Sequence, residues 1–269
     1  MVVQTQALRI ARRPRDFVRV AGPDAEDFLQ RMLSQDVAID PGDAREALLL
    51  TPKARVIATM VVLRRGADDY LLSTDANAAE RVLAELRRYR FAARVELELE
   101  HHDAAVVFST DAPAGVSYPV TDYGEAAWEV LDADVSADGE PLGEDELELL
   151  RIRAKTAKLG REIDERVLPA EAGLTDRAVS FTKGCYPGQE PVARLHYRGH
   201  ANRSLRLLAL EGNEVPAFDQ PLALDGKEVG RITSAVRAAD GVLALGFVRR
   251  EVPDDAELLA GSRKARQLD

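Results

Sequence analysis

The stretch Phe17–Val37, FVRVAGPDAEDFLQRMLSQDV, contains a short apolar run, a turn and an amphipathic segment in succession. Phe17–Val20 is typical of a short β-strand. The following Gly22-Pro23-Asp24 is typical of a helix start, because proline is tolerated in the first turn and acidic residues favour it. The next apolar residues recur at the i, i+3, i+4, i+7 spacing of a buried helix face, and they are Ala25, Phe28, Leu29, Met32 and Leu33. The stretch therefore predicts a strand followed by a helix.

The residues after this stretch extend the pattern. The runs EALLLT (46–51) and RVIATMVVL (55–63) flank Thr51-Pro52-Lys53, which predicts a hairpin. A strand over 70–73, a helix and the alternating run RVELELE (94–100) follow. The apolar face of that helix consists of Ala79, Val82, Leu83, Leu86 and Tyr89. The order strand, helix, three strands, helix, strand favours an α+β fold with split-βαβ layers over a doubly wound parallel sheet.

The whole chain has the composition of an acidic globular protein. Its 269 residues are 46% hydrophobic and carry a net charge of -10, which is enough for one large domain and a smaller one. An acidic overall field disfavours direct binding of nucleic acid. The single cysteine argues against an internal disulfide or a four-cysteine zinc site, and no apolar run approaches a membrane span. We expect a cytoplasmic protein with no membrane partner.

The second half of the chain has weaker secondary-structure signals, and a boundary between two lobes is expected where they are weakest. Between residues 110 and 143, glycines and prolines interrupt short apolar pieces, so we expect a boundary there and lobes over roughly 1–112 and 113–200. The residues 144–153 predict a helix with an acidic first turn. Three β-rich runs follow: SLRLLALE (204–211), EVGRITSAVR (228–237) and GVLALGFVRRE (241–251). They predict a small antiparallel β-barrel as a domain over 201–269.

The only cysteine lies in FTKGCYPGQEPVARLHYRG, residues 181–199. Gly184 and Gly188 allow positive φ and Pro187 fixes its own φ, so the backbone can turn sharply. A helix over 190–195 would then aim backbone N–H groups at this turn. The ammonium of Lys183, two residues before Cys185, and the helix N-terminus would lower the pKa of the thiol below about 8.5.

Three interpretations of Cys185 remain open at this point. Free cysteines are often simply buried, so core packing is one of them. A nucleophile needs a base, and the spacing to His196 does not place the two side chains together. His196 and His200 have a spacing that can bind metal on a helix, but Tyr197-Arg198-Gly199 between them should break the helix. We therefore predict no metal site made by protein side chains alone.

The segment KGCYPGQE (183–190) with PVARLHYRG (191–199) resembles the signature of the YgfZ family of tetrahydrofolate-binding proteins, relatives of the glycine-cleavage aminomethyltransferase (T-protein). The resemblance extends to residues 17–37, 47–64, LPAEAGL (168–174) and the barrel runs. It implies a three-lobed aminomethyltransferase-like fold around a central hole, with a folate-binding domain over 1–200. It also implies a role in making or maintaining iron–sulfur enzymes, including one that thiolates tRNA.

Reduced folate is the cofactor that this resemblance implies, and several side chains suit it chemically. A carboxylate can accept both adjacent N–H donors of the pterin ring, and Glu171 and Glu190 are the candidates, although Glu190 alternatively only stabilises a helix N-terminus. Tyr186 offers a face for stacking. The cations for the folate carboxylates are Lys183, Arg194, Arg198 and Arg203, of which Arg198 and Arg203 are alternatively surface charges. Gln189 and Cys185 lie within the matched signature.

Two departures bear on the activity. Aminomethyltransferases carry an Asp-Asp pair where this chain has Ala58-Thr59, and their pterin-binding Glu falls within residues that read here Arg151-Ile152-Arg153-Ala154-Lys155. The leading hypothesis is therefore a folate-binding accessory protein for iron–sulfur client or assembly proteins, with Cys185 as the redox-active or cluster-contacting group. A folate-dependent one-carbon transferase or demethylase is the alternative. A purely structural interaction protein is the third, and it predicts no folate affinity.

Overall fold

The computed structural model describes residues 8–133 and 139–268. The first sheet is antiparallel with the order β3-β4-β5-β2-β6. Its strands are β2 (Arg15–Ala21), β3 (Ala44–Leu50), β4 (Val56–Gly66), β5 (Asp69–Asp75) and β6 (Glu96–Glu100). The helices α1 (Ala25–Met32) and α2 (Ala79–Arg88) connect them in the predicted order. The α+β class and the strand-helix succession read from the sequence are confirmed.

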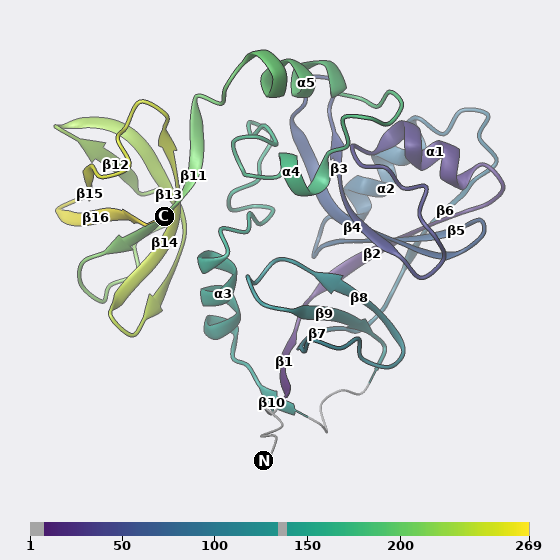
Figure 1. The fold of residues 1–269 in the computed structure, drawn as a ribbon, viewed down its shortest axis with the longest axis horizontal. Helices are drawn as coiled ribbons and strands as arrows, with labels where there is room; N and C mark the ends of the chain where they lie inside the picture. The colour runs from purple at the N-terminus through teal and green to yellow at the C-terminus, as the bar shows by residue number, and fades with distance from the viewer. Residues whose placement is uncertain (1–7, 134–138, 269) are drawn as a thin grey trace.

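The two faces of this sheet bury different partners because successive strand residues point in opposite directions. Val18 and Val20 pack with Phe28 of α1 and Leu86 of α2, so both helices cover one face. Phe17 faces the other way and packs against strands of a second sheet. The result is three layers, two helices over one sheet and that sheet over another (Figure 1).

The second sheet has the order β10-β1-β7-β9-β8. Its strands are β1 (Leu8–Arg12), β7 (Ala104–Phe108), β8 (Val116–Val120), β9 (Ala127–Leu131) and β10 (Gly139–Pro141). The sheet continues across the expected lobe division at residues 112 and 113, because β7 and β8 both pair with β9. The weak signals after residue 110 are thus short strands of one sheet.

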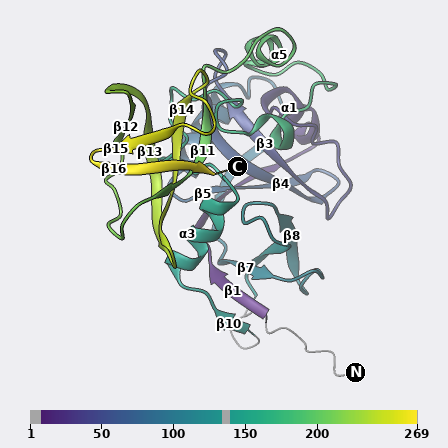
Figure 2. The same ribbon diagram turned by 60° about the vertical axis from the view of Figure 1, so that its left-hand side comes forward.

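The C-terminal part is a closed barrel with the order β11-β14-β13-β12-β15-β16, which confirms the predicted antiparallel barrel. Its strands are β11 (Arg203–Leu210), β12 (Pro221–Leu224), β13 (Lys227–Ala238), β14 (Gly241–Arg249), β15 (Glu257–Ala260) and β16 (Arg263–Leu268). The helix α3 (Glu144–Arg153), also predicted, lies between the barrel and the two sheets (Figures 1 and 2). Within the described residues no helix combines the length and the apolar character needed to cross a membrane.

The buried carboxylate of Glu162 connects α3 to the barrel. It is 0% exposed and accepts hydrogen bonds from Arg151 of α3 at 3.0 Å, from Thr233 at 2.6 Å and from Ser234 at 2.7 Å. The backbone N–H of Lys158 donates to the same side chain at 3.0 Å. Because the charge is fully paired, this cluster holds two separate parts of the chain together without an orphaned ion.

We expect Glu162→Ala to lower the free energy of unfolding by about 3–5 kcal/mol, because it removes the buried carboxylate that accepts from Arg151, Thr233 and Ser234 together. Denaturant titration followed by circular dichroism measures this. The matched control is Glu165→Ala, because the Glu165 side chain is 80% exposed and, among the described residues, pairs with Arg81 alone. The control should change stability by less than about 0.5 kcal/mol. Equal losses in both variants would contradict the assignment of Glu162 as the connection.

Candidate functional site

The cysteine loop, residues 183–188, is fixed at its C-terminal end by a close backbone approach. Gly188 has φ +85°, and a Cβ there would lie 2.6 Å from the carbonyl oxygen of Thr51 in the turn between β3 and β4. Only glycine accommodates both the conformation and the contact. The helix α5 (Gln189–Arg198) begins directly after it. The expected helix start is thus correct, but the expected break before Tyr197 is wrong, since the helix includes Tyr197 and Arg198.

The other end of the loop is fixed by Lys183. Its Nζ donates hydrogen bonds to the carbonyl oxygens of Leu33 and Gln35, both at 2.8 Å. Burial lowers the pKa of the Lys183 ammonium to about 8, against the opposing effect of Asp36. This ammonium, expected to face the thiol and the folate tail, is engaged with the segment after α1. Lys183 therefore connects the loop to the segment that follows α1.

Within the loop, Cys185 and its neighbour Tyr186 have opposite environments. Cys185 is exposed, which excludes the core-packing interpretation. The Tyr186 ring is 6% exposed and packs in a core with Leu50 and Val192, so it supports the loop and leaves no open face for stacking. Burial raises the pKa of the Tyr186 hydroxyl to about 12. The loop thus presents its sulfur outward from a packed base.

The carboxylate of Glu171, a candidate for binding the pterin, is paired within the protein. Arg203 donates to it from Nε at 3.1 Å and from Nη2 at 3.2 Å, and the N–H of Leu168 donates at 3.0 Å. The Arg203 guanidinium also lies over the Phe247 ring, 4.7 Å from its centroid. Glu171 and Arg203 therefore neutralise each other where the first half of the chain meets the barrel.

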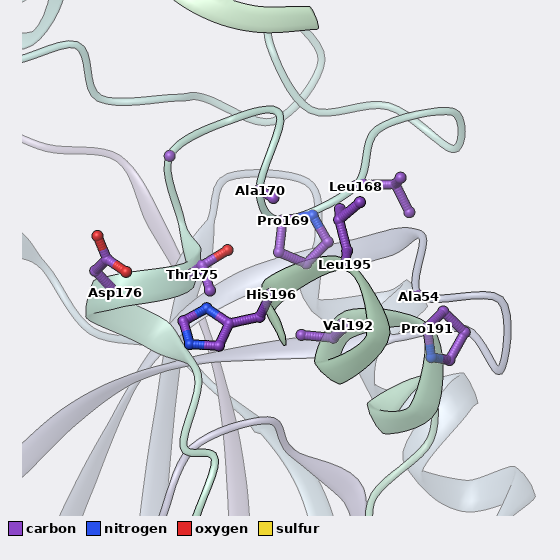
Figure 3. A pocket seen from close by; sticks show the side chains of 11 residues that line it. Ala54, Leu168, Pro169, Ala170, Thr175, Asp176, Pro191, Val192, Leu195 and His196 are labelled. Atoms are coloured by element: carbon purple, nitrogen blue, oxygen red, sulfur yellow. The ribbon is translucent and has the colours of Figure 1, made fainter. Parts of the chain in front are cut away.

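A pocket of about 250 Å³ lies beside this loop, between α5 and the segment 168–176 (Figure 3). Most of its walls are apolar, and its lining residues are Ala54, Leu168, Pro169, Ala170, Gly173, Thr175, Asp176, Pro191, Val192, Leu195 and His196. The helix α4 (Thr175–Ala178) supplies two polar residues, and the Thr175 hydroxyl is buried without a hydrogen-bond partner in the described chain. An apolar pocket with a few polar groups is a common form of small-molecule site.

None of the residues proposed from the sequence for the thiol or the folate lines this pocket. Those residues are Glu171, Lys183, Cys185, Tyr186, Gln189, Glu190 and Arg194. Glu190 and Arg194 are exposed on α5, the helix that forms one wall. The sequence analysis missed Thr175 and Asp176, which follow LPAEAGL with no periodic signal, and considered His196 only as a base or metal ligand. His196 stacks on Phe181 with ring centroids 4.0 Å apart.

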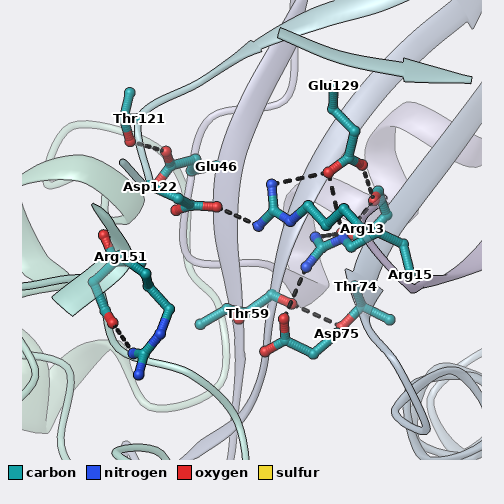
Figure 4. A network of polar contacts seen from close by, with 12 residues as sticks. Arg13, Arg15, Glu46, Thr59, Thr74, Asp75, Thr121, Asp122, Glu129 and Arg151 are labelled. Atoms are coloured by element: carbon teal, nitrogen blue, oxygen red, sulfur yellow. Dashed lines mark hydrogen bonds and ion pairs between the residues drawn. The ribbon is translucent and has the colours of Figure 1, made fainter. Parts of the chain in front are cut away.

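A polar network lies between the two sheets and α4 (Figure 4). Arg13 pairs with Asp122 and, at 2.9 Å, with Glu129, while Arg15 pairs with Asp75 at 2.8 Å. Arg177 of α4 pairs with Asp122 at 2.6 Å and also with Glu46. The arginines and carboxylates neutralise one another, so the network is a structural connection between layers.

Thr59, where aminomethyltransferases carry an acidic residue, lies beside this network. Its carbonyl oxygen accepts a hydrogen bond from the Thr74 hydroxyl at 2.8 Å, and it brings no carboxylate to the position. Arg151, within the segment that resembles the pterin-binding part of those enzymes, is committed to Glu148 and Glu162. Within residues 8–133 and 139–268 no group of three or more His, Cys, Asp or Glu side chains is arranged to hold a metal.

We expect the protein to lose stability in acid because carboxylates of this network become protonated. Burial raises the pKa of Asp122 and of Glu129, but the arginines outweigh it, and both values are lowered. A carboxylate with a lowered folded-state pKa stabilises the protein above its unfolded value of about 4 and loses this contribution as pH falls through the folded value.

Asp122→Asn should therefore be less stable than the unchanged protein at pH 7, and the gap should narrow as the pH falls below about 4. Urea unfolding at a series of pH values measures this gap. The exposed Asp255, changed to Asn, is the control and should give no gap at neutral pH. A gap for Asp122→Asn that stays constant down to the acid transition would contradict the role of the charge.

Similar proteins are known for most of the chain. Residues 16–108 match the GCVT N-terminal domain family. The chain is 28% identical over 244 residues to an iron–sulfur cluster assembly factor IBA57 homolog, mitochondrial, of Pyricularia oryzae, covering 83% of this chain and 62% of that protein. It is 42% identical over 69 residues to the tRNA-modifying protein YgfZ of Yersinia pestis, covering 24% of this chain and 21% of that protein.

The fold is that of a solved enzyme. The crystal structure of the glycine cleavage system aminomethyltransferase T from Bartonella henselae superposes with a TM-score of 0.82 at 18% identity, covering 97% of this chain and 85% of that one. This confirms the aminomethyltransferase-like fold. The names of the two relatives, IBA57 and YgfZ, agree with the resemblance noted for KGCYPGQE.

Proposed function

We propose that this chain, a GCVT-domain protein with the fold of an aminomethyltransferase, binds a reduced folate and assists the assembly or repair of iron–sulfur proteins in the cytoplasm. The observation that carries the proposal is the exposed Cys185, held in a loop anchored at both ends, beside a pocket on the same helix. The names of two relatives, an iron–sulfur cluster assembly factor and a tRNA-modifying protein, support this role. We include tRNA-thiolating enzymes among the proposed client proteins.

The pocket suits one end of a folate. Pockets for drug-sized ligands usually have volumes of about 300–1,000 Å³, so a cavity of about 250 Å³ takes the bicyclic ring and leaves the tail outside. Arg194 and Arg198 are exposed on α5 and can meet the tail carboxylates. Gln189 and Glu190 lie in the first turn of the same helix, while Lys183, Tyr186 and Glu171 support the loop and the pocket wall.

Cys185 acts outside the pocket in this proposal. As a thiolate it can ligate iron that a client protein supplies, or attack a client disulfide, forming a mixed disulfide and releasing the second client sulfur as a thiolate. The anchors on Lys183 and Gly188 hold the sulfur in one place, which lowers the entropy lost when a client docks. Folate in the adjacent pocket would stiffen α5 and the loop together.

A folate-dependent one-carbon transferase is the second candidate, favoured by the shared fold. Thr59 weighs against it, because transfer of an aminomethyl group needs an acid or base near the reacting nitrogen and no carboxylate stands at that position. Incubation with tetrahydrofolate and methylamine-type donors decides between them. Formation of methylene- or methyltetrahydrofolate over many turnovers would favour the transferase.

Titration with tetrahydrofolate should stabilise the protein. At a ligand concentration one hundred times the dissociation constant, the gain is about 2.7 kcal/mol, because only the folded state binds. The melting temperature, followed under reducing conditions, should rise with the logarithm of ligand concentration. A melting temperature that stays constant over a wide titration would exclude folate binding and leave a purely structural interaction protein.

Cys185→Ser should fold normally and lose function. Because the thiol is exposed, the replacement buries no unsatisfied hydroxyl, and the melting temperature should stay within a degree or two of the unchanged protein. The variant should fail to restore iron–sulfur enzyme activity in cells lacking the protein. Thr182→Ser, an exposed neighbour in the same segment, is the control and should restore it. Full rescue by Cys185→Ser would show that the thiol has no role.

A further inference from the structure

We infer that the end of α2 and its connection to β6 bind single-stranded nucleic acid, with the Phe91 ring stacked on an unpaired base and neighbouring arginines in contact with phosphates. This surface, residues 87–94, shares no residue with the pocket or the cysteine loop, so it does not depend on the proposed function. The net charge of -10 disfavours nucleic acid for the chain as a whole, and this segment is a local exception.

The backbone at Phe91 has a conformation that favours glycine. The N–H of Ala93 donates to the carbonyl oxygen of Arg90 at 2.8 Å, which closes a tight turn, and Phe91 has φ +41° at its second position. A positive φ at that position alone is the pattern of a type II′ turn, which usually has glycine there. A bulky residue at positive φ is strained, and such strain is concentrated at functional positions. The fold alone would therefore favour glycine at residue 91.

The Phe91 ring is also exposed to water. Its exposed fraction of 86% is the largest among the exposed large hydrophobic side chains of the described residues. The residues on either side are held in place, because Tyr89 and Ala93 pack against the core under α1 and α2. The carbonyl oxygen of Arg94 comes so close to Gly22 that a Cβ there would lie 2.4 Å away. The turn thus presents the ring to solvent from a fixed base.

The same segment is strongly basic. It reads RRYRFAAR, with no acidic residue, and its four arginines are all exposed: Arg87, Arg88, Arg90 and Arg94. Arg94 pairs with Asp24 at 2.7 Å, so the other three are the proposed phosphate contacts. The exposed pair of Arg88 with Glu85, at 3.7 Å, is too weak to prevent this. A guanidinium can donate two parallel hydrogen bonds to phosphate oxygens.

The make-up of this surface favours nucleic acid over a protein or a lipid bilayer. Its exposed residues are the four arginines, Phe91 and Ala92, so one ring is the only large exposed apolar group in the segment. A stable protein interface needs a broad packed area, and membrane anchoring needs a broad apolar face. Stacking on a base needs only the face of one ring, and the cations beside it suit the backbone. Single-stranded RNA and single-stranded DNA both offer this chemistry.

Fluorescence anisotropy of the full chain with labelled oligouridylate and oligothymidylate tests the charge contacts. At least one probe should bind at low salt, and a preference between them identifies the source. The logarithm of the binding constant should fall with the logarithm of salt concentration with a slope of about −2, from roughly 0.7 for each of three phosphate contacts. Arg90→Gln should reduce the magnitude of this slope by about 0.7. Arg249→Gln, which changes an exposed arginine of the barrel, is the control and should leave it unchanged.

Substitutions of Phe91 separate recognition from structure. Phe91→Gly relieves the strained φ and removes the ring, so the melting temperature should hold or rise while the affinity falls about tenfold. Phe91→Trp should keep the affinity, and Phe91→Leu should lose it, because leucine is apolar but has no face for stacking. The matched control is Phe218→Leu, which changes a half-exposed ring with Arg161 beside it and should leave the affinity unchanged.

Four outcomes would overturn the inference. Neither probe binds at low salt, or Phe91→Leu binds as tightly as the unchanged protein. Duplex probes of the same length bind equally well, which would reduce the surface to general charge attraction without stacking. An oligoglutamate peptide binds more tightly than either probe, which would make an acidic protein segment the occupant. Phe91→Gly melts at a lower temperature with unchanged affinity, which would assign the ring to the fold.

Discussion

Three carboxylates lie where separate parts of the chain meet, and each is neutralised by arginine: Glu129 and Glu162, which are buried, and Asp122, which is partly buried. An unpaired buried charge would cost more free energy than a small domain has to spare, so these parts can only associate with the arginines in place. Arg177 links α4 to β3 through Glu46 and to the second sheet through Asp122, and Arg151 links α3 to the barrel through Glu162.

The site follows from that frame. The segment 168–176 is fixed to the barrel by the Glu171–Arg203 pair, and the cysteine loop is fixed to the first sheet by Lys183 and Gly188. The residues that a signature brings to attention are here mostly the ones that hold the loop and its surroundings. Lys183 and Gly188 fix the loop, and Cys185 between them is exposed. The residues that hold the segment in place and the residue available for chemistry are therefore different members of the same loop.

The sequence predicted those parts of the fold whose signals are local. The apolar faces over 25–33 and 79–89 repeat at helical spacing, and the barrel runs alternate as strands, so their types were right. The strand β1 was missed because LRIAR is short and arginine-rich, and it forms by pairing with β7 almost a hundred residues away. Thr175 was missed for a similar reason: its pocket joins three segments distant in sequence, and no periodicity marks a buried hydroxyl that has no partner among the described residues.

The strand β6, at one edge of the first sheet, has the sequence ELELE. An open edge offers unpaired N–H and C=O groups to any other strand, and natural proteins protect such edges with charge. Glu96, Glu98 and Glu100 line one face of β6 and pair with Arg19 of β2, so two copies that approached edge to edge would have to accommodate a dense row of charges. The barrel needs no such protection because closure leaves it without edges. The protein should thus resist edge-to-edge association, and the protection should persist into acid at Glu100, because the hydrogen bond from Arg65 lowers its pKa to about 2.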